Sequence, residues 1–159
     1  IRGSLMQVIL CFGNEWHGDD GFGLAVYEAL THTSLPQNVE VYFCANNALM
    51  TVRNAFEANR IIIVDAYQTV EHLAGELRWA SGSQFIDEHC RNMHDGGVEE
   101  FIKHLPILCQ SDTPPSVDVL YITVQPVTGF KKQLSPEISA QIEAARNILL
   151  ESLQQEEVA

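Results

Sequence analysis

The stretch MQVILCFGNEWHGDDGFGLAVYEAL (residues 6–30) combines an apolar run, a glycine-rich turn and a helical pattern. Residues 6–12 are apolar apart from Gln7 and end at Gly13, which predicts a strand buried on both faces. From Asp20 the apolar residues follow helical spacing, at Phe22, Val26 and Leu30, so we expect a helix to about Thr31. A buried strand that leads through a turn into a helix is typical of an α/β domain.

The rest of the chain continues this alternation. Strands are expected at residues 39–43, 60–66, 76–80 and 117–125, the third of them short and nearer an edge. Helices are expected at residues 48–58, at 98–105 with an end or kink at Pro106, and from Ser135-Pro136-Glu137 to Leu153. Residues 81–94 are expected to be irregular.

Strands that alternate with helices imply crossover connections and therefore parallel pairing. We predict a single-domain, three-layer αβα sandwich over residues 1–159, with a mostly parallel twisted sheet and helices on both faces. Residues 1–5 carry no weight, since they could be an expression remnant, and residues 154–159 are expected to be a frayed acidic tail.

The composition excludes several classes of function. The 159 residues are 46% hydrophobic and 19% charged, and 9 basic against 21 acidic residues give a net charge of −12. Such a charge opposes binding to nucleic acid or to anionic membranes. No apolar run approaches the ~20 residues of a membrane span, and no signal peptide is recognisable. Cys11 and Cys44 lie in or beside apolar runs, which favours reduced, buried thiols and a cytoplasmic location.

Acidic residues follow two of the predicted strands. Asp19 and Asp20 come after the first, and Asp65 ends the apolar run RIIIVDA (60–66). Since ligands of open sheets bind beyond the carboxyl ends of the strands, these carboxylates should converge at one edge. His94 can reach the same edge, and an imidazole with two carboxylates suits a divalent metal with open coordination positions.

Each of these residues also has a purely structural interpretation. Asp19 or Asp20 is expected to cap the following helix, and capping needs only one of them. Asp65 could cap the next segment, and His94 could be an exposed loop residue. A separate metal site at His89, Cys90 and His94 is disfavoured because a fourth ligand at zinc spacing is missing.

Three other site types lack their sequence signals. Glu15 stands where the second glycine of G-x-G-x-x-G would be, and the two aspartates would repel a pyrophosphate. The chain contains no G-x-x-x-x-G-K-[ST] phosphate loop. It also contains no G-x-S-x-G turn for a serine nucleophile.

Four segments, in order, resemble the hydrogenase maturation proteases, endopeptidases that trim the C-terminal extension of the [NiFe] hydrogenase large subunit. They are ILCFGNEWHGDDGFG (9–23), IIIVDA (61–66), MHDGGVEEF (93–101) and ITVQPVTGFKKQLSPEI (122–138). In one respect the chain departs from the family, since YFCANNA (42–48) replaces the Asp-Gly-Gly loop that many members use in substrate recognition. The identity of the partner hydrogenase therefore stays open.

The resemblance implies metal ligands and catalytic residues at Asp20, Asp65 and His94. Asp19 would then cap the helix or support the site. The implied metal is nickel, supplied by the precursor of a [NiFe] hydrogenase large subunit, which is the implied partner. The nickel would serve recognition and possibly catalysis. Two alternatives remain: a metal-dependent hydrolase of another small substrate, and a noncatalytic nucleotide-binding or nickel-carrying module.

Overall fold

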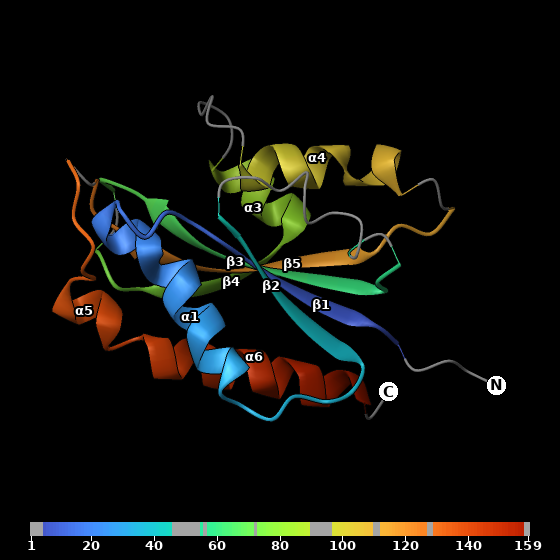
Figure 1. The fold of residues 1–159 in the computed structure, drawn as a ribbon. Coiled ribbons are helices and arrows are strands. Elements are labelled where there is room, and N and C mark those ends of the chain that lie inside the picture. Colours follow the sequence, from blue (N-terminus) through green and yellow to red (C-terminus); the bar gives the residue numbers. More distant parts are fainter. Residues whose placement is uncertain are drawn as a thin grey trace.

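The computed structural model describes residues 5–45, 55, 57–71, 73–89, 97–109, 112–126 and 129–157 (Figure 1). Its strands are β1 (Gln7–Phe12), β2 (Val39–Ala45), β3 (Arg60–Gln68), β4 (Leu77–Ser81) and β5 (Ser116–Val124). Its helical elements are the short η1 (Gly18–Gly21), α1 (Phe22–Thr31), α3 (Gly82–His89), α4 (Val98–Leu108), α5 (Pro136–Ser139) and α6 (Ile142–Glu157).

The five strands form one sheet in the order β2-β1-β3-β5-β4. All neighbouring strands are parallel except β4, which pairs antiparallel with β5 at the edge. Every residue of β1 is buried, as expected for a central strand covered on both faces. The predicted mostly parallel sheet, with a short strand at 76–80 near an edge, is confirmed.

Helices cover both faces of the sheet, so the predicted three-layer sandwich is confirmed. Figure 1 shows α1, α5 and α6 on one side and α3 and α4 on the other. The first face buries Phe22 and Val26 of α1 together with Leu149 of α6. The second buries Phe85 of α3 and Phe101 of α4. Two separate cores thus hold the central strands in place.

The stretch predicted to be irregular contains a helix, α3. Ser81 and Gln84 form a capping box at its start: Gln84 N–H donates to Ser81 Oγ (3.2 Å), and Ser81 N–H donates to Gln84 Oε1 (3.0 Å). This reciprocal pair satisfies donors that a helix start otherwise leaves free. The prediction was wrong because α3 is polar on most of its surface and buries only Gly82 and Phe85, so the segment offers too few apolar residues to mark a helix.

Two helix ends also differ from expectation. Pro106 lies inside α4, which continues to Leu108, because Cys109 N–H still donates to the carbonyl of Leu105 (3.0 Å). Proline disturbs the turn before it more than the residues after it. The predicted C-terminal helix is divided, since Gln141 N–H bonds to Ile138 at the tighter three-residue spacing (3.0 Å).

Two further predictions concern segments that the structure describes only in part. Most of the predicted helix 48–58 lies outside the described residues. The backbone of α6 is helical to Glu157 and so includes most of the segment predicted to be a frayed tail. Among the described residues, no helix is both long enough and apolar enough to cross a bilayer.

Candidate functional site

The turn after β1 folds back on the strand through glycines. A Cβ on Gly13, whose φ is +136°, would lie 2.1 Å from the carbonyl oxygen of Asp20. A Cβ on Gly23 would lie 1.9 Å from the carbonyl oxygen of Phe12. Side chains at these two positions are therefore excluded. Their absence lets the main chain around Asp20 pack against the carboxyl end of β1.

Asp20 lies in η1 and is tied to this turn through Asn14. The main-chain N–H of Asn14 donates to the Asp20 side chain at Oδ2 (3.0 Å) and to its carbonyl oxygen (3.2 Å). Burial raises the pKa of the Asp20 carboxyl, while the Asn14 N–H and the charge of His17 act in the opposite direction. The carboxylate is thus partly removed from water.

Neither acid of the pair caps α1, so that prediction was wrong. The N-cap residue of α1 is Gly21, which has no side chain, and the N-cap residue of η1 is His17, which makes no side-chain cap bond. The intervening η1 turn is the physical reason, because it places both aspartates one turn before the α-helix begins.

Asp19 is bound to a distant segment, at Ser135. The main-chain N–H of Ser135 donates to Asp19 Oδ1 (2.6 Å). The hydroxyl of Ser135 lies 3.0 Å from Oδ1 and 2.8 Å from Oδ2 of the same carboxylate. Ser135 is the N-cap residue of α5, as its position before Pro136 predicts, but its hydroxyl bonds to Asp19 rather than to its own helix. Asp19 therefore joins the η1 turn to the start of α5.

Asp65 lies in β3 rather than at its end, since the strand continues to Gln68. Pairing with β1 stops one residue earlier, at Cys11 with Val64, whereas pairing with β5 goes on. Side chains alternate along a strand, so Asp65 shares with Tyr67 the face that α3 and α4 cover. Asp65 is therefore the first residue of β3 beyond its pairing with β1.

The structure brings Asp65 and Asp20 within electrostatic range of each other. The pKa of Asp65 is raised to about 8, first by burial and then by the negative charge of Asp20. The N–H of Ala66 donates to Asp65 Oδ1 (2.9 Å) and offsets part of this rise. At neutral pH the Asp65 carboxyl therefore holds a proton unless a cation takes its place.

This pair of acids occupies the point where the chain connections diverge. The connection from β1 runs through α1 to β2 on one side, whereas β3 flanks β1 on the other. Such a switch in strand order opens a crevice beyond the carboxyl ends of the two central strands. Asp20 follows β1 and Asp65 lies on β3, so the two carboxyls flank that position.

The third predicted ligand, His94, lies outside the described residues, as does Cys90. Within the described ranges, no group of three His, Cys, Asp or Glu side chains is arranged to hold a metal. The structure therefore places two of the three predicted site residues.

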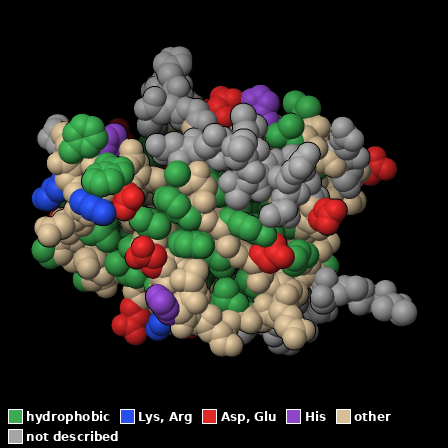
Figure 2. All heavy atoms as spheres, in the orientation of Figure 1, with side chains coloured by type: hydrophobic (Ala, Val, Ile, Leu, Met, Phe, Trp, Pro, Cys, Tyr) green, Lys and Arg blue, Asp and Glu red, His purple; other side chains and the backbone are tan. Residues whose placement is uncertain are grey.

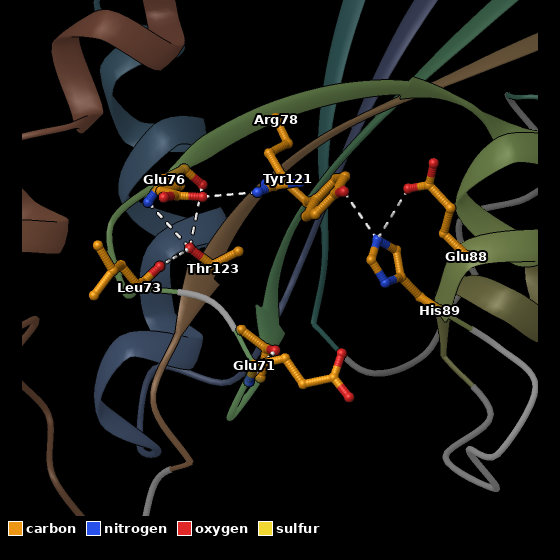
Figure 3. A network of polar contacts seen from close by, with 9 residues as sticks. Glu71, Leu73, Glu76, Arg78, Glu88, His89, Tyr121 and Thr123 are labelled. Carbon is orange, nitrogen blue, oxygen red and sulfur yellow. Dashed lines mark hydrogen bonds and ion pairs between the residues drawn. The ribbon is translucent and has the colours of Figure 1, made fainter.

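His89 ends α3 and packs against the sheet face that carries Asp65. Its Nε2 lies 2.9 Å from the hydroxyl of Tyr121, the residue paired with Asp65 in the register of β3 and β5 (Figure 3). Its ring lies 4.2 Å from that of Tyr67, centroid to centroid, and Glu88 Oε2 is 3.6 Å from Nε2. These contacts of His89 hold the C-terminal end of α3 beside the site.

The prediction of buried, reduced thiols at Cys11 and Cys44 is confirmed. Neither forms a disulfide, and both are buried. Burial, then the neighbouring Cys44 and Asp65, raise the pKa of the Cys11 thiol far above its ordinary value. Cys11 thus stays neutral beside the site and is a poor nucleophile.

Comparison with known proteins identifies the family. The sequence model of the hydrogenase maturation proteases matches residues 24–152. The chain belongs to the hydrogenase maturation protease family. The matched region contains Asp65 and the position of His94, and it begins just after Asp20. No sequence among the curated proteins matches the chain.

Solved structures share the fold of this maturation protease. The hydrogenase maturating endopeptidase HybD from E. coli aligns with a TM-score of 0.82 at 19% identity, over 96% of this chain and 94% of that one. The [NiFe] hydrogenase maturation protease HybD from Thermococcus kodakarensis aligns with a TM-score of 0.75 at 23% identity, over 94% and 99%. HycI from Thermococcus kodakarensis KOD1 aligns with a TM-score of 0.74 at 20% identity, over 96% and 95%.

Asn14, Ser135 and Tyr121 make contacts that position the candidate site, and these contacts were not predicted from the sequence. Asn14 stands in the Gly-Asn pair of the resembling segment, which was a usable signal. Ser135 acts across 116 positions of sequence, and no local pattern announces such a contact. The sequence pattern around Tyr121 indicates only that this residue lies in a strand.

Proposed function

We propose that this chain is the endopeptidase that removes the C-terminal extension from the precursor of a [NiFe] hydrogenase large subunit after nickel insertion. The observation that carries the proposal is the partly buried carboxyl pair Asp20 and Asp65 at the diverging connections of β1 and β3. Family membership supports the class of reaction. Cys11 and Cys44 are buried and form no disulfide, which supports action in the cytoplasm.

The chemistry of the pair suits a divalent cation. The pKa of the Asp65 carboxyl is raised by burial and by the charge of Asp20, and a carboxyl in such a place exchanges its proton for a metal ion when one is offered. In the proposal the ion is the nickel of the precursor, and His94 is the third ligand from this chain. Held by these three residues, nickel would mark a loaded precursor, and it would supply Lewis-acid chemistry for the attack of water on the scissile peptide bond.

The chain's own residues then have defined tasks. Asp65 releases its proton when the nickel arrives, because the cation's charge outweighs that of Asp20. Asn14 keeps the Asp20 carboxylate oriented through its main-chain N–H. Asp19 stays engaged with Ser135 and holds the turn. No serine or cysteine nucleophile is needed, which agrees with the neutral thiol of Cys11.

The direct test incubates the protein with nickel-loaded precursor and measures the mass of the product. Asp65→Asn keeps the shape of the side chain and removes its charge, and we expect cleavage to fall at least about 100-fold. Asp20→Asn should show a similar loss. The matched control is Asp112→Asn, an exposed aspartate between α4 and β5, which should cleave as the wild type does.

Each other result has a definite meaning. Undiminished cleavage by Asp65→Asn would refute the assignment of the site. Nickel binding with no change in the mass of the precursor would indicate a carrier. A thermal shift with nucleotides would indicate a nucleotide-binding module.

A further inference from the structure

Two exposed aromatic side chains lie on adjoining loops next to Asp20. Trp16, in the turn after β1, is 51% exposed, and Phe130, in the loop before α5, is 86% exposed. Together with His17, Lys131 and Lys132 they form what we call the Trp16–Phe130 patch. On soluble proteins, a contiguous exposed apolar patch marks a contact site more often than isolated exposed apolar side chains do.

The patch is built by main-chain hydrogen bonds between the two loops. Gly18 N–H donates to the carbonyl of Lys131 (2.5 Å), and Lys131 N–H donates to the carbonyl of Trp16 (2.9 Å). These bonds form an isolated parallel bridge between His17 and Lys131. The loops therefore hold their side chains in a set arrangement, although those side chains are exposed.

Ring contacts complete the arrangement. The rings of His17 and Phe130 meet edge to face, with their centroids 5.9 Å apart. The ammonium group of Lys132 lies 4.9 Å from the centroid of the Trp16 ring and 3.9 Å from Glu15 Oε2. The aromatic rings and the basic groups therefore form one surface.

Asn14 couples this surface to the proposed ligand Asp20. Its side-chain Oδ1 accepts a hydrogen bond from Trp16 N–H (3.0 Å), while its own N–H donates to Asp20 Oδ2 (3.0 Å). Asp19 and Ser135 join the same two loops a second time. A chain that places a peptide bond at Asp20 therefore passes close to the patch.

The charge of the patch indicates which chemical groups its partner presents. Lys131 and Lys132 are the only adjacent pair of Lys or Arg residues in a chain of net charge −12. In Figure 2, hydrophobic, basic and histidine side chains, with an acidic side chain beside them, lie at the left and upper left, over the end of the molecule where η1 and the loop before α5 lie in Figure 1. A local positive charge on an acidic protein favours a partner that presents a carboxylate.

We propose that the Trp16–Phe130 patch is the docking surface for the precursor segment that flanks the scissile bond. The occupant is an extended peptide with an apolar side chain, which packs against the two rings, and a carboxylate, which faces Lys131 and Lys132. This inference rests on the proposed function, since the occupant is the substrate of that reaction.

The first experiment observes binding directly. The chain has two tryptophans, and Trp79 on β4 is 40% exposed, so 5-fluorotryptophan labelling gives two ¹⁹F resonances that Trp79→Phe assigns. Adding nickel-loaded precursor to the Asp65→Asn protein should shift or broaden the Trp16 resonance and leave that of Trp79 in place. A Trp16 resonance unchanged by precursor that binds would overturn the proposal.

The second experiment separates docking from chemistry. We expect the double variant Trp16→Ala/Phe130→Ala to raise KM for the precursor at least about tenfold while kcat stays within about twofold. Lys131→Glu/Lys132→Glu should also raise KM and weaken its salt dependence. The control is Ile107→Ala, an equally apolar change at a 76% exposed site on α4, which should leave KM unaltered.

The outcomes distinguish the two proposals. If the wild type leaves nickel-loaded precursor uncleaved, the proposed function fails, and the docking proposal fails with it. If the wild type cleaves and the patch variants cleave equally well, the docking proposal alone is wrong. If the patch variants change only the oligomeric state in sedimentation, the patch binds a second copy of the chain and the docking proposal is again wrong.

Discussion

Asp19 accepts hydrogen bonds from both the main-chain N–H and the hydroxyl of Ser135, 116 positions further along the chain. The two residues join the turn that follows the first strand to the beginning of α5. Since the neighbouring Asp20 is a proposed ligand, this contact fixes a wall of the candidate site.

Removing this contact should destabilise the protein. Asp19→Ala leaves the N–H of Ser135 without its acceptor, and we expect a loss of about 1 to 3 kcal/mol in the free energy of unfolding. Asp19→Asn should lose less, because the amide oxygen still accepts from the N–H. Urea unfolding measures both, and Asp112→Ala is the exposed control. Equal stability of Asp19→Ala and wild type would contradict the structural role.

The raised pKa of Asp65 predicts how stability depends on pH. The folded protein holds the proton up to about pH 8, whereas the unfolded chain releases it near 3.8, so the stabilising contribution is complete below about pH 4 and lost as pH rises to about 8. Asp65→Asn has no such titration. At pH 8, without metal, we expect it to exceed the wild type by more than about 2 kcal/mol.

Urea unfolding at a series of pH values tests this prediction. The difference between Asp65→Asn and wild type should shrink as the pH falls toward 4. Asp112→Asn, at an exposed position, should follow the wild type throughout. A constant difference across the range would show that burial of Asp65 does not govern its titration.

Gly23 should tolerate no side chain. A Cβ there would lie 1.9 Å from the carbonyl oxygen of Phe12, so α1 could not keep its place beside the end of β1. We expect Gly23→Ala to lose more than about 3 kcal/mol or to fail to fold. Gly97→Ala is the matched control, since no atom lies within 4 Å of a Cβ at that position, and it should cost less than about 1 kcal/mol. Thermal unfolding of the two variants compares them.

Arg60 lies at the opposite end of β3 from the candidate site. We therefore expect its substitution to change only the stability of the protein. Its guanidinium is largely buried and bonds to Asp118 Oδ2 (3.0 Å), Gln7 Oε1 (3.3 Å) and the carbonyl of Ser152 in α6 (3.3 Å). Arg60→Ala leaves these acceptors without their donor, and we expect a loss of about 3 kcal/mol or more.

An exposed ion pair supplies the comparison for Arg60. Glu143→Gln breaks the pair with Arg146 at a side chain that is 80% exposed, and it should cost under about 0.5 kcal/mol. Chemical denaturation measures both changes. Comparable losses in the two variants would contradict a special role for the buried guanidinium.

Local sequence patterns predicted the central part of the fold. Apolar runs indicated β1 and β3, and the helical spacing of Phe22, Val26 and Leu30 indicated α1. The general position of ligand sites in parallel sheets then led to Asp19, Asp20 and Asp65, and the family resemblance singled out Asp20. The structure places the side chains of Asp20 and Asp65 within electrostatic range of each other. The predictions of the strands and of α1 are confirmed because each depends on burial, which the sequence expresses over a few residues. The roles of Asp20 and Asp65 stay predictions.

Other features could not be found in this way. The helix α3 buries only Gly82 and Phe85, so its start is marked by the Ser81 and Gln84 capping box rather than by periodicity. The attachment of Asp19 to Ser135 depends on how distant segments pack, and its result is that Asp19 caps no helix of its own. Side-chain partners across the fold are decided by tertiary packing.

The bond between Asp19 and Ser135 has a consequence for biosynthesis. A ribosome releases the N-terminal part of a chain first, at roughly 5 to 20 residues per second, so the loop with Asp20 emerges well before its distant anchor. The nascent protein therefore cannot complete this corner of the molecule until the strand β5 and the loop after it have been translated. The candidate site is therefore assembled only after translation has passed Ser135.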